Sequence, residues 1–268
     1  MISYRNILIY NAIIYDGDYD SVLNASCRVD DPDPRLVEKV VGELKCKVLT
    51  MVDPDYPLYL KKHTRAPLVL FYYGDISLIN DEHINSNLGI VGTRSPTDYG
   101  LMNTKKIVYE VAKDCVIVSG MADGIDGQAH RAAIEAGAKT VAVLGSGIDN
   151  PYPAVNLKLY SDIIESGGLV ISEYPNMSPP TGIHFPIRNR LIAMFSKSLL
   201  VTEAYGTMSG TSITVTFALG MGKDVMCIPY PAEEINSFCN HLLYEGAKFV
   251  RDGRDVLIDM NLEPIKII

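Results

Sequence analysis

Two short clusters in this sequence combine residue types that bind anions. Gly92-Thr93-Arg94 sets a glycine, a hydroxyl and a guanidinium directly after a run of apolar residues. The second cluster, HFPIRNR at residues 184–190, contains Phe185, Arg188, Asn189 and Arg190. Guanidinium groups bind phosphate through paired hydrogen bonds, and aromatic rings offer stacking surface to the bases of single-stranded nucleic acid. The two clusters therefore predict a site for a phosphate-bearing ligand.

Familiar phosphate-binding motifs do not account for these residues. The sequence contains no GxxxxGK[ST] motif, which excludes a P-loop nucleoside triphosphatase. Gly145-Ser146-Gly147 begins like a dinucleotide fingerprint, but Asn150 occupies the third glycine position and the residues around it are typical of a turn. We therefore expect neither a bound NAD nor FAD, nor any other cofactor.

Asp126 and His130 could suggest catalysis, because residues four apart share one face of a helix. A metal would need further ligands, and no HExxH-like set supplies them. We expect structural roles, with Asp126 ordering the start of a helix and His130 bonded locally.

The elements that must position these residues alternate regularly. Six short runs rich in Val, Ile and Leu predict buried parallel strands, at residues 88–92, 115–120, 140–145, 169–173, 198–204 and 224–229. Amphipathic segments separate or follow them, at residues 99–113, 125–136, 154–166, 185–195 and 209–221. This alternation predicts an α/β fold, an extended Rossmann-like doubly wound parallel sheet.

Nearly every predicted strand is followed by glycine or serine, at Gly92, Gly120, Gly145 and, after a short loop, Ser209-Gly210. Each glycine alone could simply make a tight turn. Together they favour an anion site, because ligands of such sheets bind at the carboxyl ends of the strands and beside helix N-termini.

The remaining chain is less regular. Residues 1–60 read as a small N-terminal appendage with one weak helix at 35–45, and residues 61–268 as the main domain, entered through a strand at 68–75.

No segment is apolar enough to span a membrane or to act as a signal peptide, and the five cysteines are scattered, so a cytoplasmic protein is expected. The net charge of −8 argues against a generic polyanion binder, so a few individual cations must carry any nucleic-acid affinity.

Taken together, the motifs resemble those of the DNA-processing protein A (DprA/Smf) family. The matching segments run in order from residue 55 to residue 257: DYP (55–57), APLVLFYYG (66–74), IVGTRSPTDYG (90–100), IVSGMADGIDGQAHRAAIEAG (117–137), VAVLGSGID (141–149) with YP (152–153), ISEYP (171–175), HFPIRNR (184–190), EAYGTMSGTSIT (203–214) and NHLLYEGAKFVRDGRDVL (240–257). The resemblance implies a Rossmann domain that binds single-stranded DNA without sequence preference, forms a homodimer and loads a RecA-type recombinase during natural transformation.

The resemblance also implies roles for individual residues. Gly92, Thr93 and Arg94 would bind phosphate, Phe185 would stack on a base, and Ser209-Gly210 would present backbone N–H groups. The triplet Arg188, Asn189 and Arg190 would hold the DNA backbone or form the pocket wall. Three features depart from the family pattern: Gly182 stands where members often carry a basic residue, the stretch around residues 205–208 is altered, and residues 1–60 match the family's helical domain poorly.

Two other functions remain open from the residues. One is a nucleoside-monophosphate hydrolase of the lysine-decarboxylase-like (LOG) group, whose PGGxGTxxE motif would fall near Gly206-Thr207. Gly210, however, occupies the position of its carboxylate. The other is a nucleotide sensor that uses the same pocket without turnover.

For the homodimer that the resemblance implies, the apolar pairs Leu242-Leu243 and Val256-Leu257 suggest a contact surface.

Overall fold

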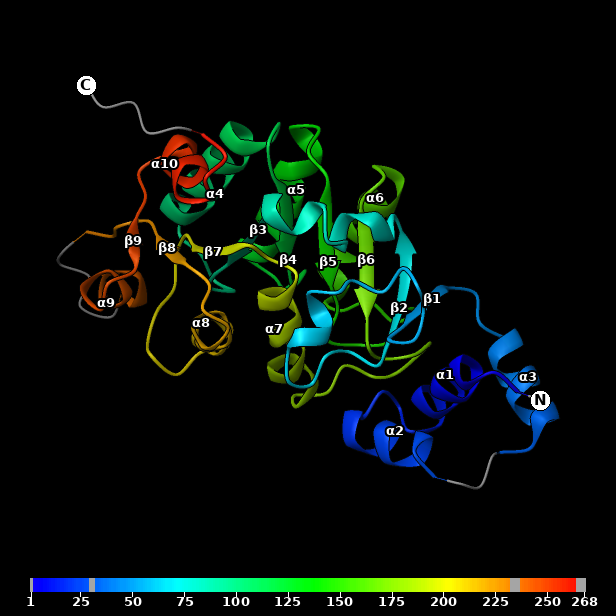
Figure 1. The fold of residues 1–268 in the computed structure, drawn as a ribbon. Helices are drawn as coiled ribbons and strands as arrows, with labels where there is room; N and C mark the ends of the chain where they lie inside the picture. Colours follow the sequence, from blue (N-terminus) through cyan, green and yellow to red (C-terminus); the bar gives the residue numbers. More distant parts are fainter. Residues whose placement is uncertain (1, 29–31, 232–236, 264–268) are drawn as a thin grey trace.

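A single mixed sheet organises the chain. The computed structural model describes residues 2–28, 32–231 and 237–263, and within them nine strands pair in the order β1-β2-β6-β5-β4-β3-β7-β8-β9 (Figure 1). The strands are β1 (Lys47–Thr50), β2 (Val69–Gly74), β3 (Asn87–Val91), β4 (Val116–Ser119), β5 (Thr140–Val143), β6 (Leu169–Ser172), β7 (Ser198–Val201), β8 (Val225–Cys227) and β9 (Lys248–Phe249).

The six predicted strands, β3 to β8, are confirmed and pair in parallel. The strand predicted at residues 68–75 is confirmed as β2. It runs antiparallel to β6, and β1 runs antiparallel to β2, so one edge of the sheet is antiparallel. A parallel pairing would need a long crossover, usually a helix, and only loops and a short 3-10 turn join β1 to β2. An antiparallel edge on a parallel sheet is common in α/β folds.

The order of the strands reverses at β3. From β3 the chain builds outward through β4, β5 and β6 on one side, and then returns to add β7, β8 and β9 on the other. Ligands of open α/β sheets bind where this reversal opens a crevice between neighbouring strand ends. The crevice lies between β3 and β7, and Gly92 is the first residue after β3.

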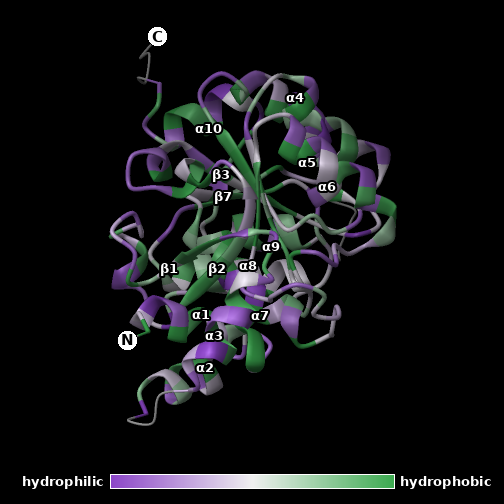
Figure 2. Ribbon diagram, turned by 90° about the vertical axis from the view of Figure 1, so that its right-hand side faces the viewer, coloured by the Kyte–Doolittle hydropathy of each residue, from purple (hydrophilic) through white to green (hydrophobic). Residues whose placement is uncertain are grey.

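Helices cover both faces of the sheet (Figures 1 and 2), as the alternating pattern predicted. On one face lie α4 (Asp98–Val111), α5 (Ile125–Glu135), α6 (Leu157–Glu165) and α10 (Gly253–Asp259). On the other lie α7 (His184–Met194), α8 (Gly210–Gly220) and α9 (Phe238–Tyr244). Short 3-10 turns occur at Leu60–Lys62, Ile76–Ile79, His83–Ser86 and Ala154–Asn156. Because both faces are covered, the strand residues are buried apolar side chains, seen as green strands in Figure 2.

Three helices precede the sheet and lie beyond its β1–β2 edge (Figure 1): α1 (Tyr4–Ile14), α2 (Tyr19–Ser26) and α3 (Pro34–Gly42). Only α3 was predicted; Pro34 begins it and the Asp33 side chain caps it. Leu8 and Ile9 of α1 are buried in the same apolar cluster as Phe71 of β2. The strand β1 falls within residues 1–60 yet pairs into the sheet, and the division of the chain near residue 60 stays a prediction.

The turn between α1 and α2 contacts the main sheet closely. Gly17 adopts φ 73°, and its backbone lies so near the end of β6 that an added Cβ would stand 2.5 Å from the Glu173 carbonyl oxygen. Asp16 accepts a hydrogen bond from the Ser178 hydroxyl. The N-terminal helices therefore rest on the loop that leads from β6 to α7.

No helix among the described residues is long and apolar enough to cross a bilayer.

Candidate nucleic-acid interface

A cavity of about 580 Å³ opens at the carboxyl ends of β3 and β7, which we call the main cavity. Its walls come from the loop after β3, the start of α5, and the first turns of α7 and α8. It brings together most of the residues predicted from sequence: Gly92, Thr93, Arg94, Phe185, Arg188, Asn189, Ser209 and Gly210. The loop residue Gly182 lines it as well.

The loop after β3 forms the floor and is held from three sides. The Thr93 N–H donates to the Glu203 carbonyl at 2.8 Å, the Ile125 N–H donates to the Thr93 carbonyl at 3.1 Å, and the Thr211 hydroxyl donates to the Gly92 carbonyl at 3.0 Å. A Cβ on Gly92 would come within 2.6 Å of both the Glu203 carbonyl oxygen and the Ile125 side chain. Glycine is therefore needed for the close packing of this floor.

The first turn of α8 supplies unpaired donors. The side chain of Ser209 accepts from the Ser212 N–H, and the Ser212 hydroxyl accepts in return from the Ser209 N–H, which completes a capping box. No described residue accepts a hydrogen bond from the N–H of Gly210 or of Thr211. These free donors, with the positive end of the helix dipole, favour an anion in the cavity.

Arg94 is exposed and stands over the ring of Phe185, with its Cζ 5.6 Å from the ring centroid. It forms no ion pair within the described part of the chain. Its guanidinium is therefore free to bind phosphate, and the ring beneath it limits the directions in which it can point.

Arg188 is buried, by contrast, and its guanidinium is partly used inside the protein. It donates to the Gly120 carbonyl at 2.8 Å and to the Val143 carbonyl, while its Nε donates to the Asn189 side chain at 3.1 Å. Burial lowers the pKa of Arg188 to about 10, because desolvation penalises the charged form, and the nearby Asp126 carboxylate opposes this. Arg188 thus fixes the cavity wall and adds positive charge from behind it.

Asn189 joins the two helices of the cavity. Its amide donates to the Gly210 carbonyl at 3.1 Å, so it ties α7 to the first residue of α8. This contact suits the wall role that the resemblance implied better than a direct contact to ligand.

Asp126 and His130 have local partners. The Asp126 carboxylate accepts from the Gly120 N–H at 3.2 Å and lines the main cavity, and burial raises its pKa. His130 bonds through Nδ1 to the Thr140 hydroxyl at 2.7 Å, and burial lowers its pKa to about 3. No group of three or more potential metal ligands occurs among the residues that the structure describes.

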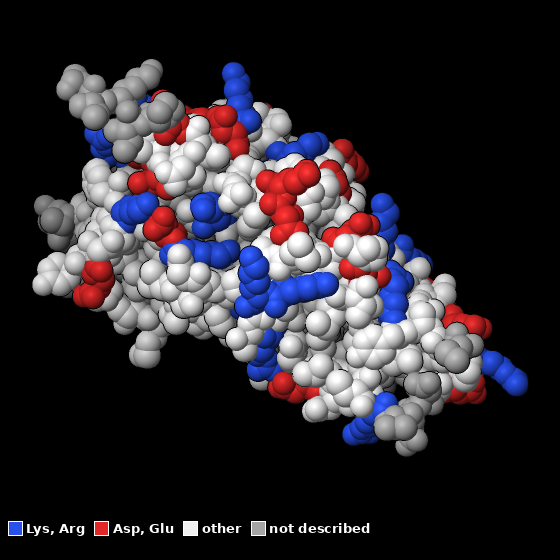
Figure 3. Space-filling view, in the orientation of Figure 1, with Lys and Arg blue, Asp and Glu red and all other residues white. Residues whose placement is uncertain are grey.

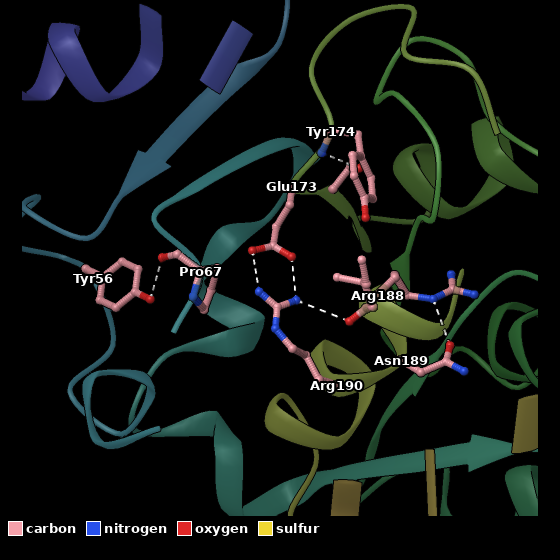
Figure 4. A network of polar contacts seen from close by, with 9 residues as sticks. Tyr56, Pro67, Glu173, Tyr174, Arg188, Asn189 and Arg190 are labelled. Carbon is pink, nitrogen blue, oxygen red and sulfur yellow. Dashed lines mark hydrogen bonds and ion pairs between the residues drawn. The ribbon is translucent and has the colours of Figure 1, made fainter. Parts of the chain in front are cut away.

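Three of the predicted site residues lie outside the main cavity. Arg190 points to the other side of α7, where its guanidinium binds both carboxylate oxygens of Glu173 at 2.5 and 2.6 Å (Figure 4). The prediction that Arg190 belongs to the ligand site is corrected, because this buried ion pair with Glu173 occupies its guanidinium. Gly145 lies beneath Phe185, where an added Cβ would stand 2.6 Å from the ring, so it permits the ring's position without reaching a ligand. Gly120 lines a smaller cavity that adjoins the main one.

Sequence reasoning missed several residues that line the main cavity, namely Ala122, Ile192, Tyr205, Thr211, Ile213 and Thr214. Ile213 and Thr214 follow Ser209-Gly210 at helical spacing, and that periodicity was the available signal. Tyr205 offered none, because its ring is placed by a bond from its hydroxyl to the buried carboxylate of Glu203.

The charges outside the cavity are mixed. On the face drawn in Figure 3, Lys and Arg are interspersed with Asp and Glu, consistent with the net charge of −8. On this face the basic groups therefore alternate with acidic ones and do not form a uniformly basic surface.

The fold and the cavity define a class: a Rossmann-like α/β protein with a cavity at the reversal point of its sheet, lined by an exposed arginine and a helix N-terminus. Residues 47–261 match the model of the family described as DNA recombination-mediator protein A, and the chain belongs to this family.

Relatives and solved structures agree with this assignment. The chain is 39% identical over 211 residues to DNA processing protein DprA of Streptococcus pneumoniae, covering 78% of this chain and 73% of the relative. It is 38% identical over 248 residues to Protein Smf of Synechocystis, covering 86% of this chain and 62% of the relative. The X-ray structure of the S. pneumoniae protein superposes with a TM-score of 0.75 at 33% identity, covering 94% of this chain and 92% of the other.

A second solved structure, DNA processing protein A from Helicobacter pylori, has a TM-score of 0.71 at 26% identity and covers 82% of this chain and 97% of the other. That protein is described by its single-stranded DNA binding mode. The predicted Rossmann-like α/β fold class is thereby confirmed.

Proposed function

We propose that this protein binds single-stranded DNA without sequence preference, with one backbone phosphate in the main cavity. The observation that carries the proposal is that the free guanidinium of Arg94, the ring of Phe185 and the unpaired N–H groups at the start of α8 line one cavity. A phosphate there would accept from Arg94 and from the helix donors.

The same geometry accounts for a lack of sequence preference. Contacts to phosphate position a strand without reading its bases, and every base has a face that can stack on an aromatic ring. Phe185 lies beside the phosphate site, so a base next to the bound phosphate can reach its ring.

The decisive test is a titration of fluorescent oligo(dT) with wild-type protein and with Arg94→Ala. We expect the substitution to weaken binding by about 5- to 150-fold, the effect of losing a charged contact of about 1–3 kcal/mol. Arg35→Ala is the matched control, because Arg35 is an exposed arginine on α3, outside the cavity lining. If wild-type protein shows no binding at low salt, or if both variants bind alike, the proposal is wrong.

We propose further that the protein acts as a recombination mediator that loads a RecA-type recombinase onto the bound strand in the cytoplasm. The family's description supports the mediator role.

A homodimer also stays a prediction. Leu242 and Val256 are buried in this chain's own core, so they cannot form the contact surface of a dimer. Exposed Tyr244 and Phe249 on the neighbouring elements are better placed for such a contact.

We propose that the protein binds DNA and is not an enzyme, in contrast to the nucleoside-monophosphate hydrolase alternative. Gly210, where the hydrolase alternative requires a carboxylate, is the first residue of α8, and Asp126, the carboxylate that lines the main cavity, is buried and bonded to Gly120. Release of free base from nucleoside monophosphates would overturn this assignment.

A further inference from the structure

A second, smaller cavity of about 270 Å³ adjoins the main one, and we call it the side cavity. Arg94, Ala122, Phe185 and Arg188 line both cavities. The remaining lining belongs to the side cavity alone: Ser95, Gly120, Asp123, Tyr152 and Pro153. Arg94 and Phe185 thus form a shared wall between two adjoining spaces.

An aromatic ring faces the side cavity in a position suited to stacking. Tyr152 is 44% exposed, and its ring centroid lies 5.7 Å from that of Phe185, with the ring planes tilted by 47°. Its hydroxyl forms no hydrogen bond with any described residue. Half-exposed aromatic rings of this kind offer a free face to another ring.

The loop that carries Tyr152 is firmly held. The Ile148 N–H donates to the Tyr174 carbonyl at 3.1 Å, and the Asp149 N–H donates to the Asn176 carbonyl at 2.9 Å. The Tyr73 hydroxyl donates to the Asp149 carboxylate at 2.8 Å. A ring on an anchored loop loses little conformational freedom when a ligand binds, so its stacking contributes more fully to affinity.

The charges in the side cavity favour a base over a phosphate. An exposed carboxylate, Asp123, lies on its wall and offsets the charge of Arg94, and Arg188 is already bonded to backbone carbonyls. The main cavity has the free N–H groups of α8 in addition to Arg94. A phosphate is thus better satisfied in the main cavity, and an uncharged ring in the side cavity.

We propose that the side cavity is a base-binding subsite in which the nucleotide adjoining the bound phosphate stacks its base on Tyr152. This inference rests on the proposed DNA-binding function and extends it. The strand passes over the wall formed by Arg94 and Phe185, with its phosphate on one side and a base on the other.

The test compares two probes, oligo(dT) and an abasic deoxyribose-phosphate oligomer of equal length. We expect Tyr152→Leu to weaken oligo(dT) binding by about 5- to 100-fold, as loss of one stacked base does, and to leave binding of the abasic oligomer within about twofold. Tyr152→Phe retains the ring and should bind oligo(dT) like wild type. Tyr4→Leu is the control, because Tyr4 on α1 is 47% exposed, close to the exposure of Tyr152, and lines neither cavity.

Each outcome decides. Equal loss on both probes would mean that Tyr152 supports the phosphate site, and no loss on oligo(dT) would mean that the base lies elsewhere; either result overturns the subsite while the proposed function stands. A loss in Tyr152→Phe as large as in Tyr152→Leu would assign the effect to the hydroxyl and overturn it too. Failure of wild-type protein to bind either probe would overturn the proposed function and the subsite with it. Thermal unfolding of each variant verifies that it folds.

Discussion

At the scale of single residues, Gly182 offers a way to strengthen the site. It lines the main cavity, and an added Cβ would meet no atom within 4 Å. We expect Gly182→Lys to tighten oligo(dT) binding by about 3- to 10-fold, because a new cation would gain an exposed phosphate contact of about 1 kcal/mol. Fluorescence anisotropy at low salt measures the change.

Gly42→Lys provides the matched control. Gly42 ends α3, it has equally open space around its Cα, and the substitution adds the same charge far from the cavity. Equal tightening by both variants would attribute the gain to net charge alone, and no tightening by Gly182→Lys would show that no phosphate passes this residue.

The residue scale also shows what the motif HFPIRNR could not reveal. Each residue of a helix turns the direction of the side chain by about 100°. Arg188 and Arg190, two positions apart, therefore point about 200° apart and cannot face one cavity together. Which of them does so depends on the partner Glu173, which comes from another part of the chain. The sequence identified the cluster that lines the site, but the direction of each guanidinium is a tertiary property.

At the scale of elements, the contact between the α1–α2 turn and the end of β6 should contribute to stability. We expect Gly17→Ala to destabilise the fold by more than about 1 kcal/mol, because the methyl group adds a clash with the Glu173 carbonyl to the cost of a positive φ. Urea unfolding measures the free energy.

Gly222→Ala separates the two effects. Gly222 also has a positive φ, 67°, but nothing lies within 4 Å of an added Cβ. This variant should therefore be destabilised by the backbone strain alone. If the two substitutions cost the same free energy, the turn does not pack on β6 as described.

Sequence patterns predicted β3 to β8 and the helices between them because these elements have unbroken apolar runs or clear amphipathic spacing. The strand β2 was predicted, but β1, the antiparallel pairing of this edge, α1 and α2 were not. The segment over α1 is apolar on more than one side, which hides helical periodicity, and the pairing of β1 and β2 depends on contacts with β6 that no local pattern encodes.

At the scale of the whole molecule, an acidic protein with one local cation site should show a shallow salt dependence. Each phosphate neutralised on a single strand contributes about −0.7 to the slope of log affinity against log salt. Because Arg94 is the exposed cation of the main cavity and Arg188 is buried, we expect one or two neutralised phosphates and a total slope of about −0.7 to −1.4. Titrations at several salt concentrations give this slope, and a value steeper than about −4 would indicate that DNA also follows basic residues outside the cavity.

The hydrogen bond between Thr211 and Gly92 joins residues 119 positions apart in the chain. A nascent polypeptide therefore completes β3 long before it completes α8, and the binding pocket stays open on one side throughout that interval. Contacts this distant in sequence also form late in folding, because the intervening chain must first lose its freedom. Affinity for DNA should accordingly arise in one of the last steps of folding. An elongating chain stalled before α8 would contain the residues of β3 and its loop but not the helix that completes the site, so it should not bind DNA.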